Sequence, residues 1–250
     1  MLVGNLALAI GPSGLLLWWA YRRNAGRSGA LHLLVYAFGL GFVAVVAALF
    51  AGVLANQARA FFGGYLRIVY DAFIVAALLE EGAKYVVIAA FISRHRAFEE
   101  VTDGIVYGMA ASIGFAIVEN LLYVGEPAMV LLLRAVTAVP LHAGCGALIG
   151  FYVGRAHSDS RNRAATGALL AILVHGTYDA LIFMGRSTAF LSLAVVAGLA
   201  MAVPLLLRHA VFLDRRLARA GLASRPSPAA PAGAKPTGEK PTGAKPTRSP

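Results

Sequence analysis

Seven apolar runs, each about as long as a membrane-spanning helix, limit what this chain can fold into. A helix needs about 20 apolar residues to cross the roughly 30 Å hydrocarbon core of a bilayer. The runs lie at about residues 3–21, 31–54, 68–92, 101–124, 127–153, 164–184 and 187–208. With 59% hydrophobic and only 14% charged residues, the composition is also unlike that of a soluble domain. The sequence therefore predicts an all-α, polytopic transmembrane helix bundle of about seven spans.

The arginines at the ends of these runs predict the orientation of the bundle. Short cytoplasmic loops are enriched in Lys and Arg. When the loops are assigned alternately to two sides, twelve arginines fall on one side and three on the other. We therefore expect the N-terminus outside and the C-terminus in the cytoplasm. The external three are Arg59, Arg67 and Arg186; the cytoplasmic twelve are Arg22, Arg23, Arg27, Arg94, Arg96, Arg155, Arg161, Arg163, Arg208, Arg215, Arg216 and Arg219.

The C-terminal part of the chain has a different composition. Residues 221–250 repeat the pattern GAKPT, GEKPT, GAKPT, and this Pro/Gly/Thr-rich, basic composition predicts a disordered cytoplasmic tail after a helical domain at 1–220. The preceding stretch, "RHAVFLDRRLARA", is amphipathic at helical spacing, and we expect it to lie along the membrane surface. The net charge of +10 is interpreted as a signal for topology and for the lipid bilayer, with no nucleic-acid partner, because the basic residues lie at span ends.

The third run, "IVAALLEEGAKYVVIAAF", carries Glu80, Glu81 and Lys84 near its middle. Each such residue costs about 2.5–3.5 kcal/mol at the centre of a membrane helix, whereas each Leu, Ile, Val or Phe returns only about 0.3–0.6 kcal/mol. The three charges nearly cancel the hydrophobicity of the helix. They are therefore expected to face protein or enclosed water, where they find partners.

Matching polar residues occur in the next three runs. The fourth contains Glu119 and Asn120, the fifth contains His142, and the sixth contains His175 and Asp179. His175 and Asp179 are four residues apart, so they share one helix face. Counted at about 1.5 Å per residue from the external ends, these groups reach related depths. We expect them to line one cavity in the outer half of the bilayer.

Several polar residues also have a structural interpretation. Lys84 can serve as a tether for the glutamates as readily as it can serve chemistry, and Arg134 is expected to snorkel or to form a structural pair. Asp103, beside a cytoplasmic loop, is expected to cap a helix. Small residues would allow the fourth and fifth runs to approach closely; they are Gly104, Gly108, Gly114, Gly144, Gly146 and Gly150.

The order of these motifs resembles that of the PrsW family of intramembrane proteases, which is related to the CAAX-type prenyl endopeptidases. The resemblance rests on "EEGAK", "GFAIVEN", a histidine in the next run and "HGTYD", and it covers about residues 65–185. It implies a protease-like core in a bacterial cytoplasmic membrane. It also implies hydrolysis of a peptide bond in a membrane protein, for example an anti-sigma-factor-like protein with a single span. The matching residues are Glu80, Glu81, Lys84, Phe115, Glu119, Asn120, His142 and His175.

The residues themselves are consistent with amide hydrolysis. This reaction needs a base to activate water, donors to stabilise the oxyanion and an acid for the leaving amine. Glu80 or Glu81 is the natural base. If a metal takes part, His142, His175 and one glutamate, for which we take Glu119, form a His₂Glu set suited to zinc. If none does, a glutamate acts on water directly and a histidine donates to the oxyanion; no HExxH motif decides between these mechanisms.

Two other functions use buried residues of the same kind. A non-catalytic scaffold would use the Glu/His set to hold helices together, and a proton-coupled transporter would use it as a proton relay. No inverted repeat of the spans is evident, which argues against transport. The presence of both glutamates and both histidines favours an enzyme over a scaffold.

Overall fold

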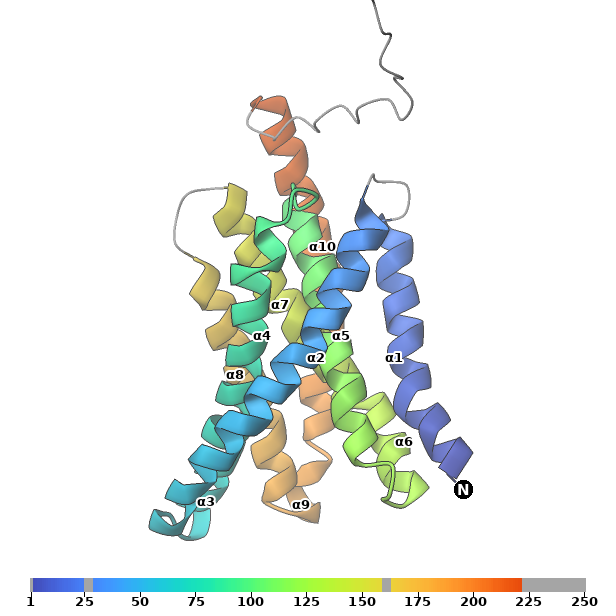
Figure 1. The fold of residues 1–250 in the computed structure, drawn as a ribbon. Helices are drawn as coiled ribbons and strands as arrows, with labels where there is room; N and C mark the ends of the chain where they lie inside the picture. The colour runs from blue at the N-terminus through green and yellow to red at the C-terminus, as the bar shows by residue number, and fades with distance from the viewer. Residues whose placement is uncertain (1, 25–28, 159–162, 222–250) are drawn as a thin grey trace, which may run out of the picture.

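The computed structural model describes residues 2–24, 29–158 and 163–221, and over these ranges it contains helices and no strands (Figure 1). The all-α class is thereby confirmed. Arg27, Arg161 and the predicted tail from residue 222 onward lie outside the described ranges. The elements are α1 (Leu2–Asn24), α2 (Ala30–Ala55), η1 (Asn56–Phe61), α3 (Gly64–Val69), η2 (Tyr70–Leu78), α4 (Leu79–Ala90), η3 (Ile92–Arg94), α5 (Val101–Leu122), α6 (Ala128–Val136), α7 (Ala138–Ser158), α8 (Ala164–Phe183), α9 (Arg186–Ala189) and α10 (Ser192–Arg219).

Within the described residues, six helical stretches are long and apolar enough to cross a membrane. The remaining predicted span, 68–92, corresponds to α3, η2 and α4, which follow one another without a gap from Gly64 to Ala90 and carry the charged residues. The polytopic bundle is confirmed, and the total of seven spans stays a prediction. The six stretches are Leu2–Arg22, Ala30–Phe61, Val101–Leu122, Ala128–Ser158, Ala164–Phe183 and Arg186–Arg219.

Helix α5 is the central helix of the bundle (Figure 1). Every residue from 103 to 117 is buried, and the helix packs against α7, α2 and α1. Its N-terminus is closed by a capping box in which the side chains of Glu100 and Asp103 accept from backbone N–H groups, which confirms the capping role predicted for Asp103. Because α5 is buried over most of its length, it can hold Glu119, near its C-terminal end, at a fixed position within the bundle.

Glycines bring the backbones of α5 and α7 into direct contact. A Cβ added to Gly104 would collide with the carbonyl oxygen of Gly150, and one added to Gly108 would collide with that of Gly146. The close approach predicted for these runs is confirmed for these four residues. Gly114 instead faces the backbone of α2. Because small residues allow membrane helices to gain packing contacts, these pairs fix the helices that carry Glu119 and His142 relative to each other.

Two predicted helices are interrupted. The run at 127–153 is divided at Thr137 into α6 and α7. Pro140 explains the division, because proline has no N–H to donate to the carbonyl of Val136 and its ring crowds that group. The run at 68–92 contains η2, a π-helix of nine residues, directly before the glutamates. π-Helical turns occur mostly at functional sites.

The last part of α10 differs from the expected arrangement. Residues 208–219, expected to lie along the membrane surface, instead continue α10 without a break and project beyond the bundle (Figure 1). The carboxylate of Asp214 gives a physical reason, because Oδ1 accepts from the N–H of Val101 at 2.8 Å and Oδ2 from the N–H of Thr102 at 3.1 Å. This helix end therefore adds a second cap to α5.

The arginine distribution leads to a topology prediction. A reporter fused after residue 220 should be active only in the cytoplasm, and one inserted near Glu126 should be active only outside, because short loops rich in arginine stay in the cytoplasm. Paired alkaline phosphatase and green fluorescent protein fusions would measure this. The reverse pattern would place the glutamates in the cytoplasmic half of the membrane.

Candidate active site

The two glutamates lie at the start of α4, immediately after the π-helix η2, and they have different environments. The side chain of Glu81 is fully buried, whereas that of Glu80 is 19% exposed. Lys84, one turn later and also fully buried, places its Nζ 2.7 Å from Glu81 Oε1 and 3.8 Å from Glu80 Oε2. The same ammonium lies 4.0 Å from the centre of the Phe115 ring. The motif thus contains its own counterion, which is held against an aromatic face.

His175 of α8 connects Glu81 to a third carboxylate. Its Nδ1 lies 2.7 Å from Glu81 Oε1, and its Nε2 lies 3.3 Å from Asp179 Oδ2. The helical spacing of four residues places Asp179 behind the ring, as the sequence indicates. Both ring nitrogens therefore face carboxylate oxygens, and the orientation of the imidazole is fixed from both sides.

His142 of α7 connects Lys84 to Glu119. Its Nδ1 lies 2.8 Å from Lys84 Nζ, and its Nε2 lies 2.7 Å from Glu119 Oε2. An ammonium can only donate, so Nδ1 accepts and the ring proton is on Nε2, directed at Glu119. The rings of His142 and His175 are perpendicular, with centres 5.2 Å apart.

Glu119 is paired with a cation from α6. Arg134 Nη2 lies 2.7 Å from Glu119 Oε1, while Arg134 Nε donates to Asn120 Oδ1 at 2.8 Å. The guanidinium also lies 4.0 Å from the centre of the Tyr123 ring. Arg134 thus forms the structural pair considered for it, rather than snorkelling. Asn120 is a positioning residue for Arg134.

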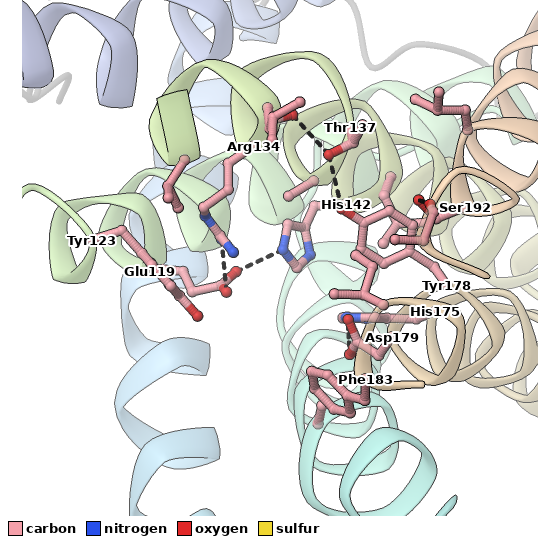
Figure 2. A pocket seen from close by; sticks show the side chains of 18 of the residues that line it. Glu119, Tyr123, Arg134, Thr137, His142, His175, Tyr178, Asp179, Phe183 and Ser192 are labelled. Carbon is pink, nitrogen blue, oxygen red and sulfur yellow. Dashed lines mark hydrogen bonds and ion pairs between the residues drawn. The ribbon is translucent and has the colours of Figure 1, made fainter. Parts of the chain in front are cut away.

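A cavity of about 550 Å³ opens beside these residues (Figure 2). Glu80 belongs to its lining, and Glu81 does not. Much of the remaining wall is apolar and comes from α6, α8, α9 and α10. The lining residues are Ala76, Glu80, Glu119, Tyr123, Val130, Leu133, Arg134, Thr137, Ala138, Leu141, His142, His175, Tyr178, Asp179, Ile182, Phe183, Ala189, Phe190, Ser192 and Leu193.

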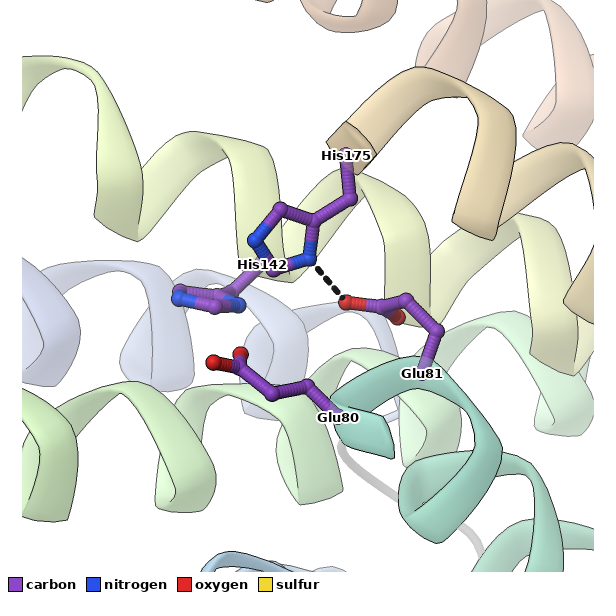
Figure 3. Close-up of side chains that lie close together, drawn as sticks. All are labelled: Glu80, Glu81, His142 and His175. Atoms are coloured by element: carbon purple, nitrogen blue, oxygen red, sulfur yellow. Dashed lines mark hydrogen bonds and ion pairs between the residues drawn. The ribbon is translucent and has the colours of Figure 1, made fainter. Parts of the chain in front are cut away.

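Three side chains of the cavity wall, together with Glu81, form a group that can hold a metal ion (Figure 3). Ligand atoms of Glu80, Glu81, His142 and His175 all lie within 4.8 Å of one another. In the described part of the chain, Oε2 of Glu80 and Oε2 of Glu81 are buried and have no hydrogen-bond partner. Two imidazoles with two carboxylates suit zinc, so this donor set fits a metal. It shares His142 and His175 with the set expected from the sequence but contains Glu80 and Glu81 in place of Glu119, which faces Nε2 of His142.

Among the polar residues of the cavity wall, Tyr123, Thr137, Tyr178 and Ser192 were not predicted from the sequence. The hydroxyl groups of Thr137 and Tyr178 lie 2.8 Å apart at the wall of the cavity (Figure 2). Tyr178 lies between His175 and Asp179 in "HGTYD", and this position in the sequence could have indicated that it lies near the site. The sequence around Thr137 contains no such indication, because the position of Thr137 depends on the break between α6 and α7.

A set of buried glutamates and histidines that lines a cavity within a bundle of membrane helices is the arrangement expected of an intramembrane hydrolase. Comparison with known proteins gives the class directly. Residues 29–207 match the model of the "PrsW family intramembrane metalloprotease". The chain therefore belongs to this family, as a multi-pass integral membrane peptidase.

Individual relatives agree with the family assignment. The chain is 34% identical over 178 residues to Protease PrsW of Oceanobacillus iheyensis, covering 70% of this chain and 80% of the relative. It is 31% identical over 183 residues to Protease PrsW of Halalkalibacterium halodurans, covering 72% and 83%. It is 30% identical over 179 residues to Protease PrsW of Bacillus subtilis, covering 70% and 80%. No solved structure matches the chain.

Proposed function

We propose that this peptidase cuts a single-span membrane protein within the outer half of the bilayer, with Glu80 as the base that activates water. The observation that carries the proposal is the difference between the two glutamates. Glu80 lines the cavity and lies 3.8 Å from its nearest ion-pair partner, Lys84, whereas Glu81 lies outside the lining and is held through Oε1 by Lys84 and His175, each at 2.7 Å. A base must reach the water that it deprotonates, and Glu80 meets that requirement.

The other residues have distinct roles in this mechanism. Glu81, His142 and His175 would hold a zinc ion, which supplies Lewis-acid polarisation when bound. Glu80 takes a proton from water in the cavity and later gives it to the leaving amine. Tyr178 and Arg134 line the same cavity and carry O–H and N–H donors for the oxyanion. Glu119 orients His142, and Asp179 orients His175.

The substrate class follows from the walls of the cavity. Leu133, Phe190 and Leu193 line it and remain 53%, 63% and 53% exposed, so the cavity wall on this side is apolar and accessible. A hydrophobic segment can therefore reach the cavity from the bilayer between α6 and α9. A protein with a single span, such as an anti-sigma factor, satisfies this requirement. Entry from the bilayer also favours membrane-spanning substrates over soluble peptides.

The test combines metal analysis with cleavage by the full chain in lipid nanodiscs. We expect about one zinc ion per chain, loss of cleavage of a fluorogenic single-span peptide on treatment with 1,10-phenanthroline, and recovery on addition of zinc. His175→Ala should lose the metal, whereas Asn5→Ala, in α1 and outside the cavity lining, should retain it. Full cleavage by metal-free protein would contradict the assignment of the ligands. Absence of cleavage under every condition would favour a scaffold.

A further inference from the structure

A second pocket, of about 450 Å³, lies next to the catalytic cavity on the side predicted to be external. Its polar residues come from η1, α3 and the start of η2. Ala76 and Phe183 line both this pocket and the catalytic cavity, so the two spaces adjoin. The residues that line it are Asn56, Arg59, Gly64, Arg67, Ile68, Asp71, Val75, Ala76 and Phe183.

One arginine of this pocket is fixed and the other is weakly held. Arg59 donates from Nε and Nη2 to the two carboxylate oxygens of Asp71, at 2.7 and 2.6 Å. Arg67 lies 3.9 Å from Asp71, beyond hydrogen-bond distance, and its side chain is 52% exposed. Two guanidinium groups thus share one carboxylate. The pocket has one excess positive charge, and Arg67 has donors to offer to an anion.

The position of this charge is unusual for the predicted external side. Of the three arginines assigned to that side, Arg59 and Arg67 are in the pocket, and the third, Arg186, begins α9 close to cavity residues Ala189 and Phe190. All three therefore lie at elements bordering the two adjoining spaces. Elsewhere the external ends of the spans carry few basic residues, so general attraction to lipid does not explain this grouping.

The distance from this pocket to Glu80 defines the length of peptide that could occupy the pocket and the catalytic cavity together. Arg67 Nε lies 3.9 Å from Asp71 Oδ2, so Asp71 marks the depth of the guanidinium, and Asp71 precedes Glu80 by nine positions in one continuous helical segment. That separation is at most roughly 13 Å along the helix axis. An extended peptide covers the same distance in about four residues.

We propose that this pocket binds an acidic side chain of the substrate, about four residues to the external side of the bond that is cut. The proposal rests on the proposed function, since it takes Glu80 as the site of cleavage. The carboxylate pairs with Arg67, while the Arg59–Asp71 pair holds the wall of the pocket. This contact sets the register of the substrate, so that one particular peptide bond reaches Glu80.

The test uses synthetic single-span peptides with an Ala/Leu span and one Asp placed at successive external positions, each with a matched Asn peptide. Binding to Glu80→Gln protein in phosphatidylcholine nanodiscs is measured by fluorescence anisotropy. We expect the best-placed Asp to bind roughly three- to tenfold more tightly than Asn. Arg67→Gln should remove this preference, Arg67→Glu should transfer it to a Lys peptide, and Arg208→Gln, at the opposite end of the bundle, should retain it. With the wild-type enzyme, Asp should lower KM and leave kcat unchanged.

Each other outcome has a definite meaning. Equal binding of Asp and Asn peptides, or a preference that survives Arg67→Gln, overturns the proposal. Loss of the preference in phosphatidylglycerol nanodiscs assigns the pocket to a lipid phosphate and also overturns it. If the preference holds and depends on Arg67 while no peptide is cut, the acidic subsite stands and the assignment of Glu80 fails.

Discussion

Replacing Glu80 with Gln should lower the rate of peptide cleavage by about 10²–10⁴-fold, the range associated with loss of a general base. Glutamine keeps the shape of the side chain and its hydrogen-bonding capacity, but it cannot accept the proton from water. The Oε2 atom of Glu80 has no hydrogen-bond partner among the described residues, so the fold should tolerate the change. Cleavage of a fluorogenic single-span peptide measures the rate, and circular dichroism checks the fold.

Controls for this prediction separate the two glutamates. Glu80→Gln should retain the bound zinc, whereas Glu81→Gln should lose both metal and cleavage, because Glu81 contacts His175 and Lys84. Residues that act as one unit are non-additive, so Glu80→Gln combined with His175→Ala should be no slower than the slower single variant. Glu126→Gln, an exposed glutamate in the loop after α5, is the matched control and should cleave normally. Normal cleavage by Glu80→Gln and Glu81→Gln alike would mean that the charges only hold the bundle together.

Replacing Lys84 with Met should destabilise the protein by about 3–5 kcal/mol, the usual cost of removing one partner from a buried ion pair. Lys84 contacts Glu81 and His142, and its ammonium is fully buried, so no water can take its place. Activity should fall together with stability, because the orientations of both partners depend on the ammonium. Unfolding of the purified protein in detergent, followed by tryptophan fluorescence, measures the change.

A second variant shows whether Lys84 acts as the counterion of Glu81. In Lys84→Met combined with Glu81→Gln, no unpaired carboxylate remains beside His175, so part of the lost stability should return. A catalytic role without a structural one makes the opposite prediction. In that case Lys84→Met would be inactive and as stable as the wild type.

The residues that carry charge inside apolar runs could be predicted from the sequence because their burial is so costly. Glu80, Glu81, Glu119, His142 and His175 come from four segments, and the structure brings them together around Lys84. Contacts of 2.7–2.8 Å connect all of them except Glu80, which lies 3.8 Å from Lys84 Nζ. The cost of an unpaired charge in hydrocarbon leaves few arrangements other than a shared cluster.

The distribution of roles within the cluster could not be predicted in this way. Sequence spacing does not distinguish Glu80, which lines the cavity, from Glu81, which is buried behind it, because the rotation of α4 is set by packing and by η2. The choice of the glutamates that could hold a metal depends on the same rotation, which sequence spacing does not give; the set expected from the sequence therefore contained Glu119 in place of Glu80 and Glu81. The continuation of α10 past the bundle depends on Asp214, whose partners are more than 100 residues away.

The π-helix before the glutamates has a consequence for how this segment can change in evolution. Each π-type hydrogen bond reaches one residue further along the chain than an α-helical one, so η2 contains extra residues relative to an α-helix of the same rise. Deleting one residue between 70 and 78 could be absorbed by reversion to α-helical turns. A deletion that the π-type turns did not absorb would turn the following helix by about 100° and point Glu80 away from the cavity. Length changes beyond what these turns can absorb therefore alter the site even though they lie outside it, and the length of the segment is constrained more tightly than the identities of its apolar residues.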